Sequence, residues 1–309
     1  MKMKKLIPSF AMTFMLSVAL IGCSSNEKVD SEASGTQPVG ELFDYEIIGI
    51  EAGSGIHGLT EKSIDEYELD GWKLVEGSSS AMLATLDKAY KKKEPIVVTA
   101  WEPHWMFSKY DLKLLKDDKV IFGEPEKIYT LVRNGFKEDQ PNAYKFFKQF
   151  AWKSEDLALV MQMIEDGLEP EAAAGKWIKE HPDTVNKWIE GVEKVNGEKI
   201  TLVYNSWTDI IASTNVVAKA LKDKGYDVNL MQVDAAPIFA GLASGSADAF
   251  VGAWLPTAHS SYYEKYKDQI ETVGVNLEGT VMGLAVPTYM EDINSLEDLG
   301  KKMEELEKK

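Results

Sequence analysis

Three tryptophans in this sequence stand where their indole rings could bind a cation. Trp101 and Trp254 lie in two copies of the pattern Ala-Trp-x-Pro, at residues 100–103 and 253–256. Apolar, strand-like runs precede both copies, and proline stiffens the chain after each tryptophan. Trp207 follows a third strand-like run. The pattern predicts three indoles at the tips of strands, where ligands bind in open α/β sheets.

The faces of these indoles would suit a quaternary ammonium group. An indole face attracts a cation by about 2 kcal/mol or more once water is excluded, so three faces could contribute roughly 6 kcal/mol if they added. A Kd of about 1 μM corresponds to about −8.2 kcal/mol. A quaternary ammonium has no N–H to satisfy, whereas a primary ammonium would lose its hydration without compensation. Burial in a hydrophobic core would account equally well for each tryptophan taken singly.

A glycine-rich turn at residues 53–58 offers the opposite chemistry. It connects a predicted strand to a predicted helix, where backbone N–H groups and the helix dipole form an anion site. The turn matches neither a dinucleotide-binding nor a P-loop pattern, and a tight connection would explain its glycines equally well. His259 follows Trp254 by five residues. Together these groups describe a zwitterion site, with a cation on the indoles and a carboxylate on Gly55, Ile56 and His259.

The elements that would carry these residues occur twice in the same order. In the first copy, strand-like and helix-like runs alternate over residues 43–51, 60–69, 72–76, 78–92 and 96–99. In the second copy, the same alternation covers residues 200–205, 213–225, 227–233, 237–244 and 249–252. The alternation predicts an α/β fold, and the repetition predicts two lobes, each a sheet flanked by helices. A chain of 309 residues is also long for a single core.

The stretch between the two copies is predicted to be helical. Helices are expected over residues 142–150 and 154–165, and two more within residues 170–193, with a break near Pro182. Three tryptophans of this stretch lack the Trp-x-Pro setting and are expected in the core: Trp152, Trp177 and Trp188.

Three further segments have an expected role. Residues 290–309 carry a charged surface pattern with an apolar line and are expected to form a terminal helix. The apolar segments at residues 124–130 and 282–287 have no strong helix signal. We expect them to cross between the lobes as hinges.

The N-terminus has the form of an export signal. Three lysines precede an apolar run over residues 10–21, which is too short for a typical membrane-spanning helix. The run ends in Leu-Ile-Gly-Cys, which looks like a bacterial lipoprotein box and implies removal of residues 1–22 and lipidation of Cys23. Lipid chains there would hold the protein on the outer face of the cytoplasmic membrane. Residues 23–42 are expected to be a flexible tether because they are rich in serine, glutamate and glycine.

Charge and cysteine content restrict the possible partners. The net charge of −16 argues against nucleic acid, whose phosphates an acidic surface would repel. Cys23 is the only cysteine of the chain, so no disulfide can form within it. Packed cores must therefore supply the stability of the fold.

Five motifs follow one another along residues 43–309: Gly-Ser-Gly-Ile, Trp-x-Pro-His-Trp, Trp followed by Ile-Ala-Ser-Thr-Asn, Gly-Ser-Ala-Asp-Ala, and Ala-Trp-Leu-Pro-x-x-His. Their order resembles the glycine betaine-binding lipoproteins of osmoprotectant ABC transporters. The resemblance implies a two-lobed, periplasmic-binding-protein-like (venus flytrap) fold. It also implies uptake of compatible solutes such as glycine betaine or proline betaine through an ABC permease, with no catalysis, cofactor or metal.

The resemblance also assigns residues and lobes. It implies that Trp101, Trp207 and Trp254 form the cage, and that Gly55, Ile56 and His259 bind the carboxylate. The order of the segments resembles the circularly permuted branch of the family. This implies one lobe of residues 43–123 plus 288–309 and a second lobe of residues 124–287.

Two residues depart from the pattern. His57 directly follows the anion turn, and Glu102 directly follows Trp101. Either side chain could contact the pocket and change its selectivity among betaines and bulkier ammonium or sulfonium solutes. Exposure to solvent is the alternative for both.

Two other function classes, a metal receptor and an enzyme, find little support in the sequence. A metal receptor would need its histidines to converge at the cleft, and His57, His104 and His259 could do so in principle. No close ligand spacing and no histidine-rich loop support a zinc site. For an enzyme, Ala52 stands where a nucleophile elbow Gly-x-Ser-x-Gly needs its first glycine, and the carboxylates are dispersed.

Overall fold

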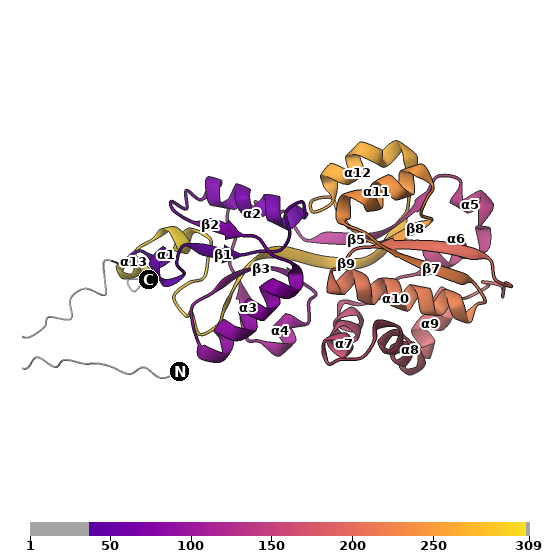
Figure 1. Cartoon of the computed structure of the whole chain (residues 1–309), viewed down its shortest axis with the longest axis horizontal. Coiled ribbons are helices and arrows are strands. Elements are labelled where there is room, and N and C mark those ends of the chain that lie inside the picture. Colours follow the sequence, from indigo (N-terminus) through magenta and orange to yellow (C-terminus); the bar gives the residue numbers. More distant parts are fainter. Residues whose placement is uncertain (1–36, 307–309) are drawn as a thin grey trace, which may run out of the picture.

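The computed structural model describes residues 37–306, which form a two-lobed α/β fold around one continuous nine-stranded sheet (Figure 1). The strands are ordered β2-β1-β3-β9-β5-β8-β6-β7, and β4 pairs with β9 beside this path. The predicted two-lobed α/β class is therefore confirmed. Cys23, the export signal and most of the expected tether lie outside the described residues.

The first lobe begins with a parallel three-stranded sheet. Its strands, in the order β2-β1-β3, are β2 (Lys73–Val75), β1 (Glu46–Ile48) and β3 (Val97–Glu102). Two helices connect them, α2 (Gly55–Glu66) and α3 (Ser79–Lys92), and Figure 1 shows these on opposite sides of the sheet. Serine starts both helices, because the side chains of Ser54 and Ser78 accept hydrogen bonds from first-turn N–H groups.

The second lobe repeats this arrangement. Its parallel strands have the equivalent order β7-β6-β8, with β7 (Asp227–Gln232), β6 (Lys199–Tyr204) and β8 (Ala249–Leu255). The connecting helices are α10 (Thr208–Asp223) and α11 (Ala235–Ser244). The predicted double occurrence of strand–helix–strand–helix–strand is confirmed, and the third strand of each copy carries one Ala-Trp-x-Pro tryptophan.

Two antiparallel strands join the lobes. Strand β9 (Ile270–Pro287) pairs through residues 270–280 with β5 (Glu126–Arg133), and through residues 281–287 with β3 and β4 (Leu112–Leu114). Strand β5 also pairs with β8. Figure 1 shows β9 running from one lobe into the other. The two segments expected to cross between the lobes are thus parts of strands.

The helices predicted between the two copies form in the second lobe. They are α6 (Pro141–Gln149), α7 (Ser154–Glu165), α8 (Pro170–Glu180) and α9 (Pro182–Trp188), and α7 and α8 pack against α10. Trp152, Trp177 and Trp188 are buried there and lie in contact with one another. The prediction that these three tryptophans belong to the core is confirmed.

The helix expected over residues 290–309 does not form within the described range. That part of the chain contains a short 3-10 turn, η2 (Glu297–Gly300), and one short helix, α13 (Met303–Leu306). The N–H groups of Asn294 and Ser295 donate to the Asp298 carboxylate, at 3.0 and 2.9 Å. A side chain that bonds nearby backbone groups competes with helix formation, and this explains the difference.

The remaining short elements connect the larger ones: α1 (Val39–Leu42), α4 (Met106–Lys109), α5 (Phe136–Asp139), α12 (Ser260–Tyr266) and η1 (Lys267–Gln269). Helix α1 lies within the last residues of the expected tether, where Val39 is fully buried and its N–H donates to the Lys301 carbonyl. In the described range, every helix lacks the combination of length and apolar character that crossing a membrane requires.

Candidate ligand-binding site

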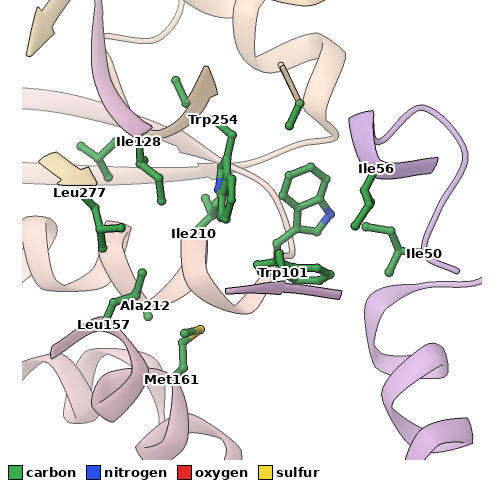
Figure 2. Close-up of a cluster of buried hydrophobic side chains, with 14 of the residues drawn as sticks. Ile50, Ile56, Trp101, Ile128, Leu157, Met161, Ile210, Ala212, Trp254 and Leu277 are labelled. Atoms are coloured by element: carbon green, nitrogen blue, oxygen red, sulfur yellow. The ribbon is translucent and has the colours of Figure 1, made fainter. Parts of the chain in front are cut away.

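The three predicted tryptophans line one cavity between the lobes. Trp101 comes from β3, Trp254 from β8, and Trp207 from the position before α10. The free space is about 290 Å³, including its open mouth, and its lining consists of Ile50, Ile56, Trp101, Trp207, Trp254, Ala258 and Met282. Figure 2 shows Trp254 on one side of this cluster and Ile50 and Ile56 on the other. The rings of Trp101 and Trp207 lie 6.5 Å apart and are tilted by 46°.

Carboxylates orient two of these indoles through their N–H groups. Trp207 Nε1 donates to Glu51 Oε1 at 2.5 Å, which links the second lobe to the first. Trp254 Nε1 donates to Asp209 Oδ2 at 3.0 Å. Burial raises the pKa of Asp209 to about 6, although hydrogen bonds from Trp254, from nearby backbone N–H groups and from Trp101 act in the opposite direction. Neither carboxylate was predicted from the sequence.

The anion turn leads directly into a helix. Helix α2 begins at Gly55, and its N-cap Ser54 accepts the N–H of His57 at 3.3 Å. The N–H groups of Gly55 and Ile56 belong to the first turn, which has no intrahelical acceptors. Neither group finds an acceptor within the described part of the chain. These two amides are therefore free to bind an anion, in the field of the helix N-terminus.

Gly55 also lies in close contact with the backbone of the second lobe. A Cβ atom on Gly55 would lie 2.0 Å from the carbonyl oxygen of Ala258. No side chain can occupy that space while the backbones stay where they are. The glycine is thus required by contact with the second lobe, not by a positive φ.

His259 lies behind Trp207 and is fully buried. Its ring stacks on the Trp207 indole, with centroids 5.5 Å apart and planes at 5°. Its Nδ1 accepts the backbone N–H of Trp254 at 3.0 Å, and Nε2 has no partner among residues 37–306. Burial lowers the pKa of His259 to about 3, so the ring is neutral at physiological pH and carries its proton on Nε2. A buried donor without an acceptor is unusual and points to a ligand oxygen.

Glu126 positions the loop that carries Ala258 and His259. It lies at the start of β5, is buried, and accepts the backbone N–H groups of Thr257 and Ala258. Burial raises the pKa of its carboxyl group, an effect that the two backbone hydrogen bonds oppose. No sequence pattern pointed to Glu126, because its partners lie more than 130 positions away.

None of the histidines in the described part of the chain, His259 included, is among the side chains that line the cavity. His57 is buried in the first lobe with Nε2 3.6 Å from Glu61 and 3.8 Å from Glu76. His104 packs edge-on against Trp101, and its Nε2 lies 2.9 Å from Thr208 Oγ1. Within residues 37–306, no group of three or more metal-ligating side chains is arranged to hold a metal.

Glu102, the second departure from the family pattern, points away from the cage. Its side chain is exposed and lines a separate groove beside α7, together with Phe107 and Glu155. Glu102 and His57 are both absent from the lining of the tryptophan cavity.

Polar contacts hold the lobes together around the cavity. Besides the Trp207–Glu51 and His104–Thr208 pairs, Lys109 Nζ lies 3.1 Å from Glu165 Oε1 across the cleft. The Tyr262 hydroxyl donates to the Gly53 carbonyl. The structure is therefore a closed form.

The buried titratable groups predict loss of stability in acid. Burial lowers the pKa of His104, like that of His259, to about 3, whereas an unfolded histidine titrates near 6.5. Below about pH 6.5 these histidines bind protons in the unfolded state but not in the folded state. Each histidine therefore lowers the free energy of unfolding by about 1.4 kcal/mol per pH unit. Asp209 acts oppositely, because its raised pKa adds stability as the pH falls from about 6 to about 4. Burial also raises the pKa of Glu126, which acts in the same direction as Asp209. The two histidines lose stability from about pH 6.5 downward, before Asp209 begins to take up its proton near pH 6, so the net effect is a loss.

We therefore expect the thermal midpoint to fall as the pH is lowered from about 7 to about 5. Differential scanning calorimetry in buffers of equal ionic strength would measure it. His104→Gln, which can still donate to Thr208, should show a clearly weaker pH dependence over the same interval. A midpoint that does not change between these pH values would contradict the neutral, buried state of the two histidines.

Comparison with known proteins agrees with this geometry. Residues 29–180 and 198–309 match the family described as the substrate binding domain of ABC-type glycine betaine transport systems. The glycine betaine/carnitine transport binding protein GbuC of Listeria monocytogenes is 48% identical over 299 residues, which cover 96% of this chain and 98% of that protein.

Two solved structures are also similar over part of the chain. Lactococcal OpuAC, in its closed-liganded conformation with glycine betaine, is 40% identical over 50% of this chain and 63% of its own, with a TM-score of 0.45. The glycine betaine/L-proline-binding protein ProX of Borrelia burgdorferi is 38% identical over 48% of this chain and 57% of its own, also with a TM-score of 0.45. The family match and the Listeria relative both extend over nearly the whole sequence, and this chain belongs to the family of substrate-binding domains of ABC-type glycine betaine transport systems.

Proposed function

We propose that this protein is an extracytoplasmic receptor that encloses glycine betaine, or a related quaternary-ammonium zwitterion, and delivers it to an ABC permease. One observation carries the proposal: three indoles from different elements of both lobes line a single cavity between them. Family membership gives the transport role, and the Listeria relative is named for glycine betaine and carnitine. The proposal includes no catalytic step.

The cation of the ligand binds against Trp101, Trp207 and Trp254. The other walls of the cavity are aliphatic or thioether side chains, so no wall side chain requires a hydrogen bond from the ligand. A trimethylammonium group offers none, and it presents its methyl groups to the indole faces. The cavity between the three indoles is small, which suits a compact solute.

The carboxylate of the ligand binds to three neutral donors. The free N–H groups of Gly55 and Ile56 point from the start of α2, and His259 supplies its Nε2–H. Charge–dipole hydrogen bonds of this kind are stronger than those between neutral groups. Because Gly55 and Ile56 lie in the first lobe and His259 in the second, a bound carboxylate would tie the lobes together.

Lobe closure is part of the proposed mechanism. Residues 43–123 with the C-terminal residues form one lobe and the chain from residue 124 forms the other, as the strand pairing supports. The pairing of residues 281–287 with β3 and β4 favours a border inside β9, near residue 280. Bending of β5 and β9 would open the cavity.

The cellular placement is also a proposal. Residues 1–22 would direct export, and Cys23 would carry lipid chains that hold the receptor near its permease on the outer face of the cytoplasmic membrane. Mass spectrometry of the mature protein would detect the lipidated Cys23, and Cys23→Ser should release the protein from the membrane fraction.

Isothermal titration calorimetry with a ligand panel tests the proposed function. Glycine betaine, proline betaine, carnitine, choline and zinc would be titrated separately into purified protein, and tryptophan fluorescence would follow the same titrations. We expect saturable binding of at least one betaine, with a change in indole emission, and no specific zinc binding. Tight binding of zinc without any binding of a betaine would overturn the proposal.

Betaine affinity should depend only weakly on salt. Raising the ionic strength from about 0.1 M to about 1 M shortens the Debye length from about 10 Å to about 3 Å. A cation enclosed by indole faces is poorly screened, so Kd should change by less than about threefold. Calorimetric titrations at several sodium chloride concentrations would measure this. A steep loss of affinity would indicate an open, solvent-filled site.

A further inference from the structure

Asp209 carries a carboxylate that is buried beside the tryptophan cavity. Asp209 lies in the first turn of α10, two residues after Trp207, and is 2% exposed. Its Oδ2 accepts the Trp254 N–H at 3.0 Å. Within residues 37–306, Oδ1 has no hydrogen-bond partner.

This carboxylate has no positive partner among the described residues. The groups that favour its charged form are hydrogen-bond donors, among them the Trp254 indole and the backbone N–H groups of Asp209 and Ile210. Burial keeps both buried histidines of this region, His104 and His259, neutral. A buried carboxylate that lacks a counter-charge costs stability, so its presence calls for an explanation.

We propose that Asp209 is the counter-charge for the quaternary ammonium of the ligand, and that it makes the cavity select a permanent cation over an uncharged group of the same shape. The inference rests on the proposed function and deepens it. Asp209 does not line the cavity, and it acts through Trp254, which lines the cavity and donates its indole N–H to Asp209. A carboxylate that accepts an indole N–H makes the ring face more negative, and its own field reaches the cation through a low-dielectric wall.

A simpler explanation is that Asp209 only orients Trp254 and caps the start of α10. Asp209→Asn separates the two, because the amide oxygen can still accept the Trp254 N–H while the negative charge is lost. Asp209→Ser is a second neutral variant with a short polar side chain. Circular dichroism would show which of the two folds as the wild type does.

The test compares two ligands that differ in charge alone. The first is glycine betaine, and the second is 3,3-dimethylbutyrate, in which a tert-butyl group replaces trimethylammonium and the carboxylate is kept. We expect the neutral variants to lose on the order of tenfold or more in affinity for glycine betaine, as removal of a charge several ångströms away predicts. Their affinity for 3,3-dimethylbutyrate should be unchanged or higher.

Equal losses for both ligands would overturn the inference in favour of a purely structural role, and so would unchanged affinity for both. Glu51→Gln is the matched control, because Glu51 accepts the Trp207 N–H but is partly exposed to screening water. Glu51→Gln should lose less affinity for glycine betaine than Asp209→Asn does. An equally large loss would contradict the assignment of the counter-charge to Asp209. If the wild-type protein fails to bind glycine betaine, the proposed function itself is refuted. If the wild type binds it, but the Asp209 variants keep the same ratio of affinities for glycine betaine and 3,3-dimethylbutyrate, only this inference is refuted.

Discussion

Gly55→Ala should weaken glycine betaine binding by at least about 100-fold, because the added methyl group prevents the lobes from closing. Its carbon would lie 2.0 Å from the Ala258 carbonyl oxygen, a contact between two backbones that no rotamer change can relieve. Overpacking costs about 1–3 kcal/mol, and a backbone clash belongs at the upper end of that range. Separation of the lobes would also draw His259 away from the Gly55 and Ile56 amides.

Calorimetry would measure the affinity of this variant, and small-angle scattering with and without ligand would measure its closure. Gly58→Ala is the matched control on the same helix, since a Cβ on Gly58 would meet nothing within 4 Å. The control should bind normally and be slightly more stable, because alanine favours an exposed helix position. Wild-type affinity in Gly55→Ala would show that the ligand binds to an open form.

The repeated motif predicted the position of the cage because each step depends on local chemistry. An apolar run gives a strand, proline ends it, and the tryptophan between them is carried to the strand tip. Trp101 and Trp254 therefore lie in equivalent strands, β3 and β8, and meet at one cavity. Trp207 was found the same way, although α10 begins directly after it and not at Ser213.

Helix starts were predicted too late, for a related reason. The turn residues Gly55 and Thr208 resemble loop residues in sequence, yet α2 and α10 begin there. Ser54 caps α2, and glycine is accepted at Gly55 because of the contact with Ala258. Glycine lowers the stability of a helix, but at this position no larger residue fits between the lobes.

The carboxylates that support the site could not be predicted from sequence. Glu51, Glu126 and Asp209 have partners that lie 156, 131 and 45 positions away, so their roles arise only from the tertiary fold. An acidic residue in the first turn of a helix is normally expected to be solvent-exposed and to interact with the helix N-terminus. Asp209 is buried instead, because the Trp254 indole covers it.

Replacement of any one cage tryptophan by alanine should weaken betaine binding by more than about tenfold, since each desolvated indole face contributes about 2 kcal/mol or more. Phenylalanine in the same positions should restore part of the loss, because a benzene ring is a weaker cation–π partner than indole. Titration calorimetry of the Ala and Phe variants of Trp101, Trp207 and Trp254 would measure both effects. Trp152→Ala is the control: Trp152 packs against Phe150 and Trp177, so its removal should lower the thermal midpoint but leave Kd within about twofold. Equal losses of affinity at all four positions would mean that the tryptophans act only through the stability of the fold. The assignment of the cation to the cage of Trp101, Trp207 and Trp254 would then be wrong.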